Sequence, residues 1–284
     1  MRYLTLFLMM VIGQTPGWTA MVSVTDLPKS GVLLIGPSDN QYSAFFNKLG
    51  FSTAPVLDGF KPYSVLIRNA GESGVVGYAI RWTVTSPSGK SKSTTFFSSV
   101  PASLKLPRRN PNDGVSKASP APNEVQLVAP AFRVQAGGKL PPNALLQAWL
   151  PELQRYAAAT AINVALDSVI FEDGTWVGEN KSHFVDVFQA QISAEHDVKL
   201  AVHRARARRA SVEEVFGTVK EMAGSDQLQP PGMDSPPSEW YRYYCQLTAR
   251  EILSVRDTSG DEAALSVVYT HFYSVRPLLA KGAQ

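Results

Sequence analysis

Strict alternation of side-chain character between positions 78 and 85 is the feature that most constrains the fold. Large apolar residues fall on one set of alternate positions and smaller or polar residues on the other: Tyr78, Ile80, Trp82 and Val84 against Ala79, Arg81, Thr83 and Thr85. A period of two is typical of a β-strand with one buried face and one wetter face. Turn-forming residues at 69–74 and 86–90 separate this strand from strand-like residues at 63–68 and 94–97. The sequence therefore predicts a meander of three consecutive strands.

Strand signals continue to about residue 178. Strand-like residues recur at 124–134, and a later strand is predicted to alternate Ile162, Val164, Leu166 and Ile170 with Asn163, Ala165, Asp167 and Val169. Asp173-Gly174 then lies between two β-forming segments, which predicts a hairpin with a type I′ turn, because both central residues of that turn need a positive φ. Seven or so short strands at this spacing predict an antiparallel β-sandwich.

Two segments between these strands lack a strand pattern. Residues 105–123 hold four prolines, which predict an exposed loop because proline cannot donate to a sheet ladder. Residues 143–156 predict a short helix that is interrupted at Pro151.

Residues 62–97 resemble an immunoglobulin-like or fibronectin-like module, in which a central tryptophan packs between two sheets, as Trp82 is placed to do. Together with the strand-turn segment at 164–178, this stretch resembles uncharacterised exported bacterial proteins with such a sandwich. The resemblance implies a fold and no activity. Cys245 is the only cysteine, so the disulfide of antibody domains is absent.

The second half of the chain is helical by pattern. Four amphipathic helices are expected at residues 182–209, 211–224, 238–255 and 262–276, with a proline-rich linker at 225–238. Ser182 and Ser238 are predicted N-caps, and Ser211 with Glu214 matches a capping box. These helices either form a small bundle of their own or pack on an outer face of the sandwich.

The predicted fold class is therefore α+β. An N-terminal immunoglobulin-like antiparallel β-sandwich, residues 21–180, precedes a C-terminal helical region of about four helices, residues 181–284.

Residues 1–20 predict an export signal. Arg2 is the only charge, and an apolar run from Tyr3 to Gly13 is shorter than the roughly 20 residues needed to span a bilayer. Cleavage after Ala20 is one expectation and cleavage after Gly17 is the alternative. The protein is thus expected to be exported, either periplasmic or secreted, with no stable transmembrane segment after leader removal.

Composition limits the class of partner. The formal net charge of the 284-residue chain is +3, and removal of Arg2 with the leader leaves +2. A nearly neutral chain lacks the overall field of a nucleic-acid binder, so no nucleic-acid partner is expected.

A basic run near residue 206 is the most noticeable charge feature. Arg204, Arg206, Arg208 and Arg209 are expected at the C-terminal end of a helix, where they complement the helix dipole. The charges wrap around the helix end, which favours a solvated helix end over a dedicated anionic-surface site. Together with Trp176 they form the candidate interaction surface.

Catalytic, metal-binding and cofactor-binding residues are not predicted. Glu172, Asp173 and Glu179 surround one hairpin turn, where Asp-Gly is explained by turn geometry. His196 and His203 are seven apart rather than at the four-residue spacing of a helical zinc pair. Cys245 is expected to be an inert buried thiol.

The sequence hence favours an exported non-catalytic protein, a scaffold or interaction module whose partner is an envelope or extracellular protein. The alternative is a hydrolase or carbohydrate-binding protein with its site between the sandwich and the helices. A third hypothesis is binding of anionic surfaces through residues 204–209.

Overall fold

The computed structural model describes residues 20–27, 30–48, 59–99, 123–130, 132–135, 148–224, 227–232, 235–270 and 280–281. The predicted leader, most of the predicted loop at 105–123 and the end of the last predicted helix lie outside the described residues. Within them the protein is a mixed α+β fold with two sheets, neither of which closes into a barrel.

The larger sheet has six strands. In the order β10-β9-β8-β4-β5, with β1 also on β8, they are Ala280–Lys281, Thr175–Gly178, Ala161–Phe171, Val75–Thr85, Ser91–Ser99 and Met21–Thr25. β1 and β10 pair in parallel with their neighbours, whereas β4 pairs antiparallel with both β5 and β8. The expectation of a wholly antiparallel sandwich is therefore wrong at these two edges.

The smaller sheet has four antiparallel strands. In the order β2-β3-β6-β7 they are Val32–Ile35, Val65–Asn69, Val125–Ala129 and Phe132–Gln135. The predicted meander is wrong, because β3 belongs to this sheet while β4 and β5 belong to the other. The turn where the chain passes from one sheet to the other is held by the Asn69 side chain, which accepts from Gly71 N (3.0 Å) and donates to Ser73 O (2.9 Å).

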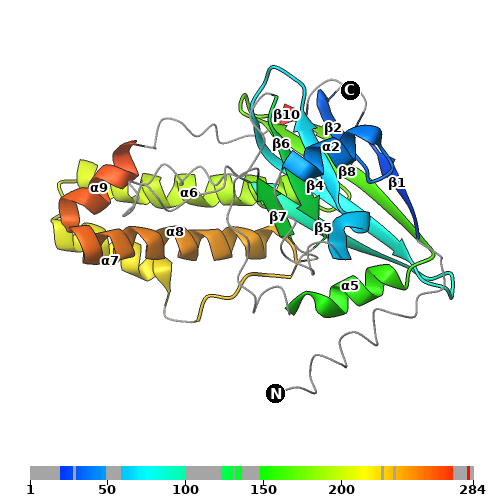
Figure 1. Ribbon diagram of the computed structural model, residues 1–284. Coiled ribbons are helices and arrows are strands. Elements are labelled where there is room, and N and C mark those ends of the chain that lie inside the picture. Colours follow the sequence, from blue (N-terminus) through cyan, green and yellow to red (C-terminus); the bar gives the residue numbers. More distant parts are fainter. Residues whose placement is uncertain are drawn as a thin grey trace, which may run out of the picture.

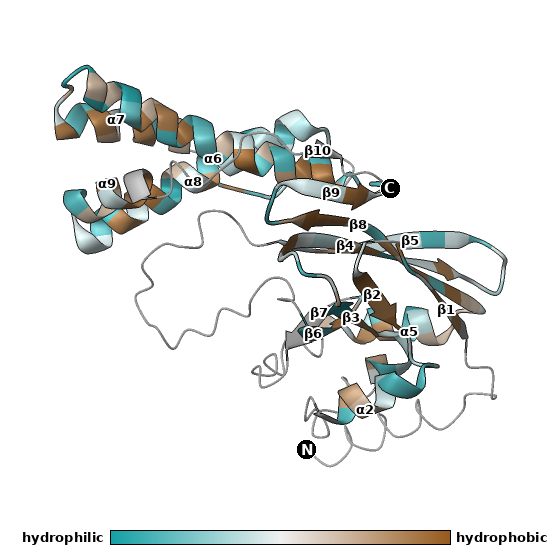
Figure 2. Ribbon diagram, turned by 90° about the horizontal axis from the view of Figure 1, so that it is seen from above, coloured by the Kyte–Doolittle hydropathy of each residue, from teal (hydrophilic) through white to brown (hydrophobic). Residues whose placement is uncertain are grey.

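The two sheets face each other as two layers, with one apolar core between them (Figure 2). Tyr78, Ile80, Trp82 and Val84 all face this core, as the alternation predicts. Trp82 is fully buried, and its indole nitrogen donates to Tyr63 O at 3.0 Å. This bond satisfies the one polar atom of the largest side chain in the core.

A β-bulge at Asp167 changes which side chains of β8 point into the core between the sheets. Ala79 pairs with Ser168 and Ile80 with Leu166, so Asp167 is the extra residue. As a result Val169 faces the core between the sheets, and Ile170 faces the opposite side. The predicted alternation is correct up to Leu166 and wrong beyond it.

The β8–β9 hairpin is present with a different turn. Gly174 N donates to Phe171 O (2.9 Å), and Gly174 has a φ of +83° while Asp173 does not have a positive φ. This is a three-residue loop with glycine in the left-handed region, not a type I′ turn. Asp173 instead accepts from Thr175 N (2.8 Å) and Oγ1 (2.7 Å).

The described residues form six α-helices rather than about four. Two lie in the first half: α2, Asn40–Lys48, and α5, Leu150–Ala157, with the short 3-10 helix η1 at Lys61–Tyr63. Pro151 occupies the first turn of α5, where its missing N–H costs nothing, so it starts the helix instead of interrupting it. The other four are α6, Phe184–Ala207, α7, Val212–Ala223, α8, Pro237–Ser259, and α9, Asp261–Thr270.

These four helices form an arm that extends away from the sheets (Figure 1). The first half of α6 packs on the outer face of the six-stranded sheet, where Phe184 and Phe188 meet Ala79 and Ile170. The second half of α6 shares a separate apolar core with α7, α8 and α9. The sequence left open whether the helices pack on the sandwich or form a bundle of their own. The first half of α6 packs on the sheet, and its second half belongs to a helical bundle.

Of the predicted helix N-caps, the one at Ser211 is present, and those at Ser182 and Ser238 are not. Ser211 and Glu214 form the capping box at the start of α7. Ser182 does not cap α6, which begins after His183, and Ser238 lies inside α8, which begins at Pro237. Proline at the first turn of α8 replaces the side-chain cap that the sequence suggested.

Candidate functional site

The residues predicted to form one interaction surface lie near opposite ends of α6. Arg204, Arg206, Arg208 and Arg209 are all exposed at the C-terminal end of α6. Trp176 lies on β9 and packs half-buried against the cluster that holds the start of α6. With a rise of about 1.5 Å per residue, the ends of this 24-residue helix are roughly 36 Å apart. The arginines and Trp176 therefore do not form one surface.

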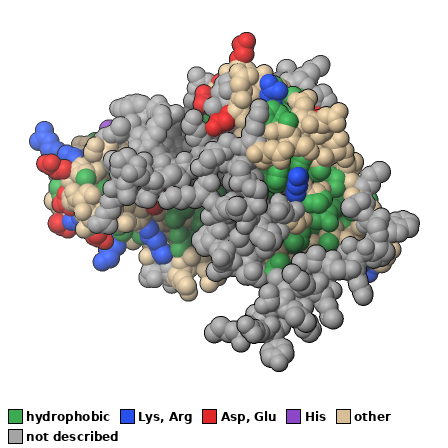
Figure 3. Space-filling model, viewed as in Figure 1, with side chains coloured by type: hydrophobic (Ala, Val, Ile, Leu, Met, Phe, Trp, Pro, Cys, Tyr) green, Lys and Arg blue, Asp and Glu red, His purple; other side chains and the backbone are tan. Residues whose placement is uncertain are grey.

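The far end of the arm, here called the arm tip (residues 204–213 and 256–262), carries charges of both signs (Figure 3). Arg256 pairs with Glu213 of α7 (2.8 Å) and Asp261 of α9 (2.7 Å), and its guanidinium lies 4.1 Å from the centre of the Phe216 ring. These contacts join three helices at the tip. The arginine run at the C-terminal end of α6 belongs to this same charged tip.

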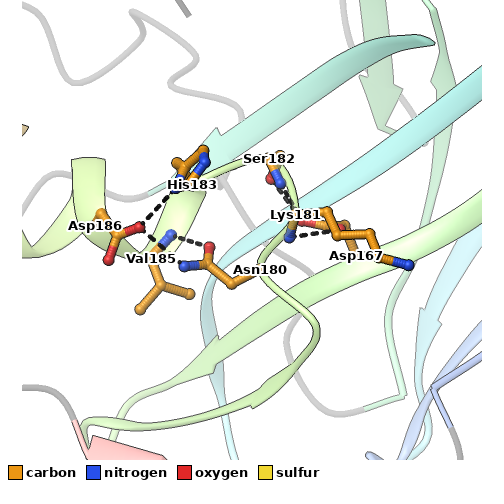
Figure 4. Close-up of polar contacts among 7 residues, drawn as sticks. All are labelled: Asp167, Asn180, Lys181, Ser182, His183, Val185 and Asp186. Carbon is orange, nitrogen blue, oxygen red and sulfur yellow. Dashed lines mark hydrogen bonds and ion pairs between the residues drawn. The ribbon is translucent and has the colours of Figure 1, made fainter. Parts of the chain in front are cut away.

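At the base of the arm, Asp167 anchors the segment that connects β9 to α6 (Figure 4). The side chain of Asp167 is fully buried and accepts from Lys181 N (3.1 Å), Ser182 N (3.0 Å) and Ser182 Oγ (2.6 Å). Arg81 Nε lies 4.0 Å from the same carboxylate. A buried carboxylate with several donors holds a connection in one geometry.

The backbone around this anchor is equally constrained. Asp167 O accepts from Glu179 N (3.0 Å), and a Cβ at Gly178 would stand 2.2 Å from that oxygen. Gly178 has a φ of +117°, which only glycine adopts readily. The N-cap residue of α6, His183, makes no side-chain cap, and Asn180 Oδ1 instead accepts from Val185 N in the first turn at 2.9 Å. We call Asp167, Gly178, Asn180 and Ser182 the base anchor.

The base anchor is not a catalytic triad, although serine, histidine and aspartate occur together there. Ser182 Oγ donates to Asp167 and not to a histidine, while His183 Nδ1 lies 3.1 Å from Asp186. A nucleophile needs its base within hydrogen-bonding reach. The arrangement therefore acts structurally, by fixing the direction in which α6 leaves the sheet.

A second polar group, missed by the sequence analysis, lies between the arm and the sheet. A cavity of about 120 Å³ lies beside the end of β5 and between α6 and α8, lined by Ser99, Gln191, Glu195, Tyr244, Leu247, Thr248 and Glu251. Gln191, Glu195 and Thr248 are buried, and Gln191 Nε2 donates to Glu195 Oε1 at 3.1 Å. We call this the junction cavity.

Lys199 lies one helical turn beyond Glu195 and is 3% exposed. Its Nζ makes no hydrogen bond to a described residue. Burial lowers the pKa of the Lys199 ammonium, while Glu195 and Glu251 oppose that shift. Burial and then the Glu195 carboxylate raise the pKa of Glu251. Both directions follow from burial and from the proximity of the three charged side chains.

Tyr244, which lines this cavity, belongs to an aromatic cluster near the start of α8. Tyr244 stacks on Trp240 with ring centroids 5.8 Å apart, and burial raises the pKa of Tyr244 to about 12. The phenol is therefore neutral at physiological pH. On the neighbouring face of α8, Tyr241 donates to Asp197 Oδ2 (2.6 Å), and burial raises the pKa of the half-buried Cys245 thiol, which fits the expected inert role.

A signal for the junction cavity exists in the sequence. Gln191, Glu195 and Lys199 recur every four residues on α6, and Tyr244, Thr248 and Glu251 recur at helical spacing on α8. Two polar stripes on neighbouring helices indicate a polar contact only once the helices are known to pair. The carboxylates near the hairpin, by contrast, stay apart from this group: Glu172 and Asp173 are exposed on the turn, and Glu179 pairs with Lys181.

The described part of the chain offers no group of three or more histidine, cysteine, aspartate or glutamate side chains that could hold a metal ion. In the same residues, no helix combines the length and the apolar character needed to cross a membrane. No family model, no curated protein and no solved structure matches the chain. The arm, the base anchor and the junction cavity are the features of the described residues that bear on function.

Proposed function

We propose that this is an exported, non-catalytic binding protein that acts as a scaffold or interaction module in the cell envelope or outside the cell. One observation carries the proposal: the β layers hold a helical arm at its base, and the arm ends in an exposed charged tip (Figure 1). The base anchor and the packing of Phe184 and Phe188 support a fixed direction for α6. A preorganised element binds a partner at lower entropic cost than a mobile one.

The arm tip is the proposed contact surface. Arg204, Arg206, Arg208 and Arg209 are exposed on the last turn of α6 and just after it. Arginine suits recognition of carboxylates because its guanidinium donates two parallel hydrogen bonds. The partner proposed here is an envelope or extracellular protein with an acidic surface.

A photocrosslinking residue at Ala207, introduced in the native host, tests this proposal. A discrete adduct with one protein is expected, and it is expected to disappear in the Arg204→Glu/Arg208→Glu variant. The matched control is Lys90→Glu/Lys92→Glu, which makes the same charge change at the exposed β4–β5 hairpin. Loss of the adduct in both variants, or absence of any adduct, would contradict the proposed surface. Adducts with nucleic acid or lipid would favour the anionic-surface hypothesis.

Export is proposed from the apolar leader at residues 1–20. β1 begins at Met21, so cleavage after Ala20 would leave this strand and its pairing with β8 whole. The mass and N-terminal sequence of the protein from its native host test this. A protein that keeps Met1 and stays in the cytoplasm would contradict export.

We also propose that the two sheets are a divergent immunoglobulin-like sandwich. Trp82 at the centre of the shared core supports this relation. The parallel pairings of β1 and β10 are departures from the antiparallel pattern of that fold.

The hydrolase or carbohydrate-binding alternative has one observation in its favour, because the junction cavity lies between sheet and helices and holds two carboxylates. Its volume of about 120 Å³ is well below the roughly 300–1,000 Å³ of ordinary small-molecule pockets. A sugar ring between two carboxylates needs more room than this. Turnover of a glycan by the purified protein, abolished by Glu251→Gln, would support the alternative.

A further inference from the structure

β5 is a long edge strand of the larger sheet. It spans nine residues, Ser91–Ser99, and β4 is its only strand partner among the described residues. The other edge strands of the two sheets, β1, β2, β7 and β10, have two to five residues. An edge strand presents a row of backbone N–H and C=O groups, and a second strand can pair with them. The outer edge of β5 is therefore the longest pairing surface that the described sheets offer.

β5 lacks most of the features that keep an edge strand from pairing. Those features are prolines, bulges, several charges or a covering helix. β5 holds no proline, its register with β4 runs without a bulge from Ser91 to Ser99, and Lys92 is its only charged residue. The β4–β5 hairpin points away from the arm, so the helices of the arm do not cover the first half of β5 (Figure 2).

Two apolar layers reach this edge. Phe96 packs against the core between the sheets, and Phe97 packs on Phe184 of α6 with ring centroids 5.1 Å apart. Both phenylalanines of β5 stay partly exposed, whereas their partners on β4, Ile80 and Ala79, are fully buried. A strand beside β5 would place side chains next to both rings, which adds apolar burial to the backbone pairing.

The sequence of β5 is complementary to itself in the antiparallel direction. When two copies of β5 pair about a two-fold axis at Thr95, the middle residue of the strand, Thr95 lies opposite its own copy. Thr94 then lies opposite Phe96 of the second copy, and Ser93 lies opposite Phe97. Each aromatic ring thus meets a smaller side chain on the same face of the sheet, and cross-strand pairs of an aromatic with a β-branched residue are stabilising.

The charges near β5 also permit this pairing. Lys92 would lie opposite Ser98 of the second copy, so the two copies of Lys92 would be about 20 Å apart along the strands. That distance exceeds the Debye length of about 8 Å, so their repulsion is screened. Arg155, which donates to Thr94 Oγ1 at 2.9 Å, is already paired with Glu152 at 2.7 Å.

We propose that the chain forms a homodimer through β5. The two copies of β5 pair antiparallel about a two-fold axis at Thr95 and join the two six-stranded sheets into one continuous sheet. A two-fold dimer is closed, because each copy uses its β5 edge once and no third copy can add there. This inference does not depend on the proposed function of the arm, which is carried by other residues.

A cysteine crosslink tests the register. Thr95→Cys in a Cys245→Ser background of the full mature chain is expected to give a disulfide-linked dimer on mild oxidation, because Cα atoms of directly opposite residues lie about 4.5–5.5 Å apart. Ser93→Cys is the matched control on the same face of β5. In the proposed register its two copies are about 14 Å apart, which is too far for a disulfide, so no crosslink is expected.

Analytical ultracentrifugation measures the dimer itself. The full mature chain is expected to sediment as a dimer in reversible exchange with its monomer. Thr95→Lys places two lysines directly opposite each other and is expected to raise the Kd of the dimer at least about tenfold. Ser88→Lys makes the same charge change in the exposed turn before β5 and is expected to leave that Kd unchanged. Thermal melts of each variant separate loss of pairing from loss of fold.

Three results would each overturn the proposal: a chain that stays monomeric at every concentration, a dimer that folded Thr95→Lys leaves intact, or a Ser93→Cys crosslink as strong as that of Thr95→Cys. Hydrogen exchange of the β5 amides distinguishes the remaining occupant of this edge. A monomer in which every β5 amide is protected would show that the same chain covers the edge, and it would overturn the proposal as well.

Discussion

The β layers and the helical arm differ in how their buried polar side chains are paired. In the β layers the fully buried Trp82 indole donates to a backbone oxygen, and the fully buried Tyr78 hydroxyl donates to Gln126 Oε1 at 3.1 Å. The arm buries Gln191, Glu195 and Lys199 along α6, and the lysine ammonium has no hydrogen-bond partner among the described residues. A fold gains little stability from such a cluster, because desolvation offsets the attraction between the charges. Stability alone therefore gives no reason for the buried polar stripe of the arm.

Breaking the base anchor is expected to have the largest effect. Asp167→Ala removes the acceptor of Lys181 N, Ser182 N and Ser182 Oγ. Because each unsatisfied donor costs about 1–3 kcal/mol, we expect a loss of about 4 kcal/mol in the free energy of unfolding, measured with urea. Asp173→Ala, at an exposed turn, is the control and is expected to cost under about 1 kcal/mol. Equal effects of the two changes would contradict the role of the base anchor.

Removing one charge of the buried cluster is expected to cost somewhat less. Lys199→Met leaves Glu195 without its nearby cation, and we expect a loss of about 3 kcal/mol. Replacing all three charges, by Glu195→Leu, Lys199→Met and Glu251→Leu, is expected to restore most of this stability. Urea unfolding of both variants measures the contrast. A triple variant less stable than Lys199→Met would show that the cluster exists for stability.

The stability of the arm is expected to depend on pH through Glu251. Its pKa is raised by burial in the folded state, so the unfolded chain loses the proton first. The contribution of Glu251 is therefore fully present below its unfolded pKa and is lost as the pH rises through the raised folded pKa. Thermal melts across the acidic range are expected to show a flatter profile in Glu251→Gln, and the same profile in Glu239→Gln as in the natural protein.

The smallest effect is expected at the capping box of α7. Ser211→Ala removes the oxygen that accepts from Glu214 N (3.3 Å), at a cost of about 1 kcal/mol. The backbone N–H of Ser211 and then its side chain lower the pKa of Glu214, and alanine removes only the second of these effects. The part that depends on the side chain is present above the unfolded pKa of Glu214 and is lost as the pH falls through the lowered folded pKa. Urea unfolding at neutral and acidic pH is expected to show a smaller difference between Ser211→Ala and the natural protein at the acidic pH.

Local patterns predicted much of this fold. The alternation around Trp82 placed that side chain in the core, and the Ser211–Glu214 spacing placed the start of α7. The bulge at Asp167 and the crossing of the chain between sheets after β3 were not predicted, because both depend on strand pairings with residues distant in the sequence. The junction cavity was missed for the same reason, since Glu195 and Glu251 come together only when α6 and α8 pair.

The base anchor is expected to hold the arm in one direction relative to the sheets. Pulsed electron paramagnetic resonance between spin labels at Ala207→Cys and Ser88→Cys, in a Cys245→Ser background, measures this most directly. One narrow distance distribution is expected, and it is expected to broaden when Asp167→Asn is added. A broad distribution in the presence of Asp167, or a narrow one that Asp167→Asn leaves unchanged, would contradict it.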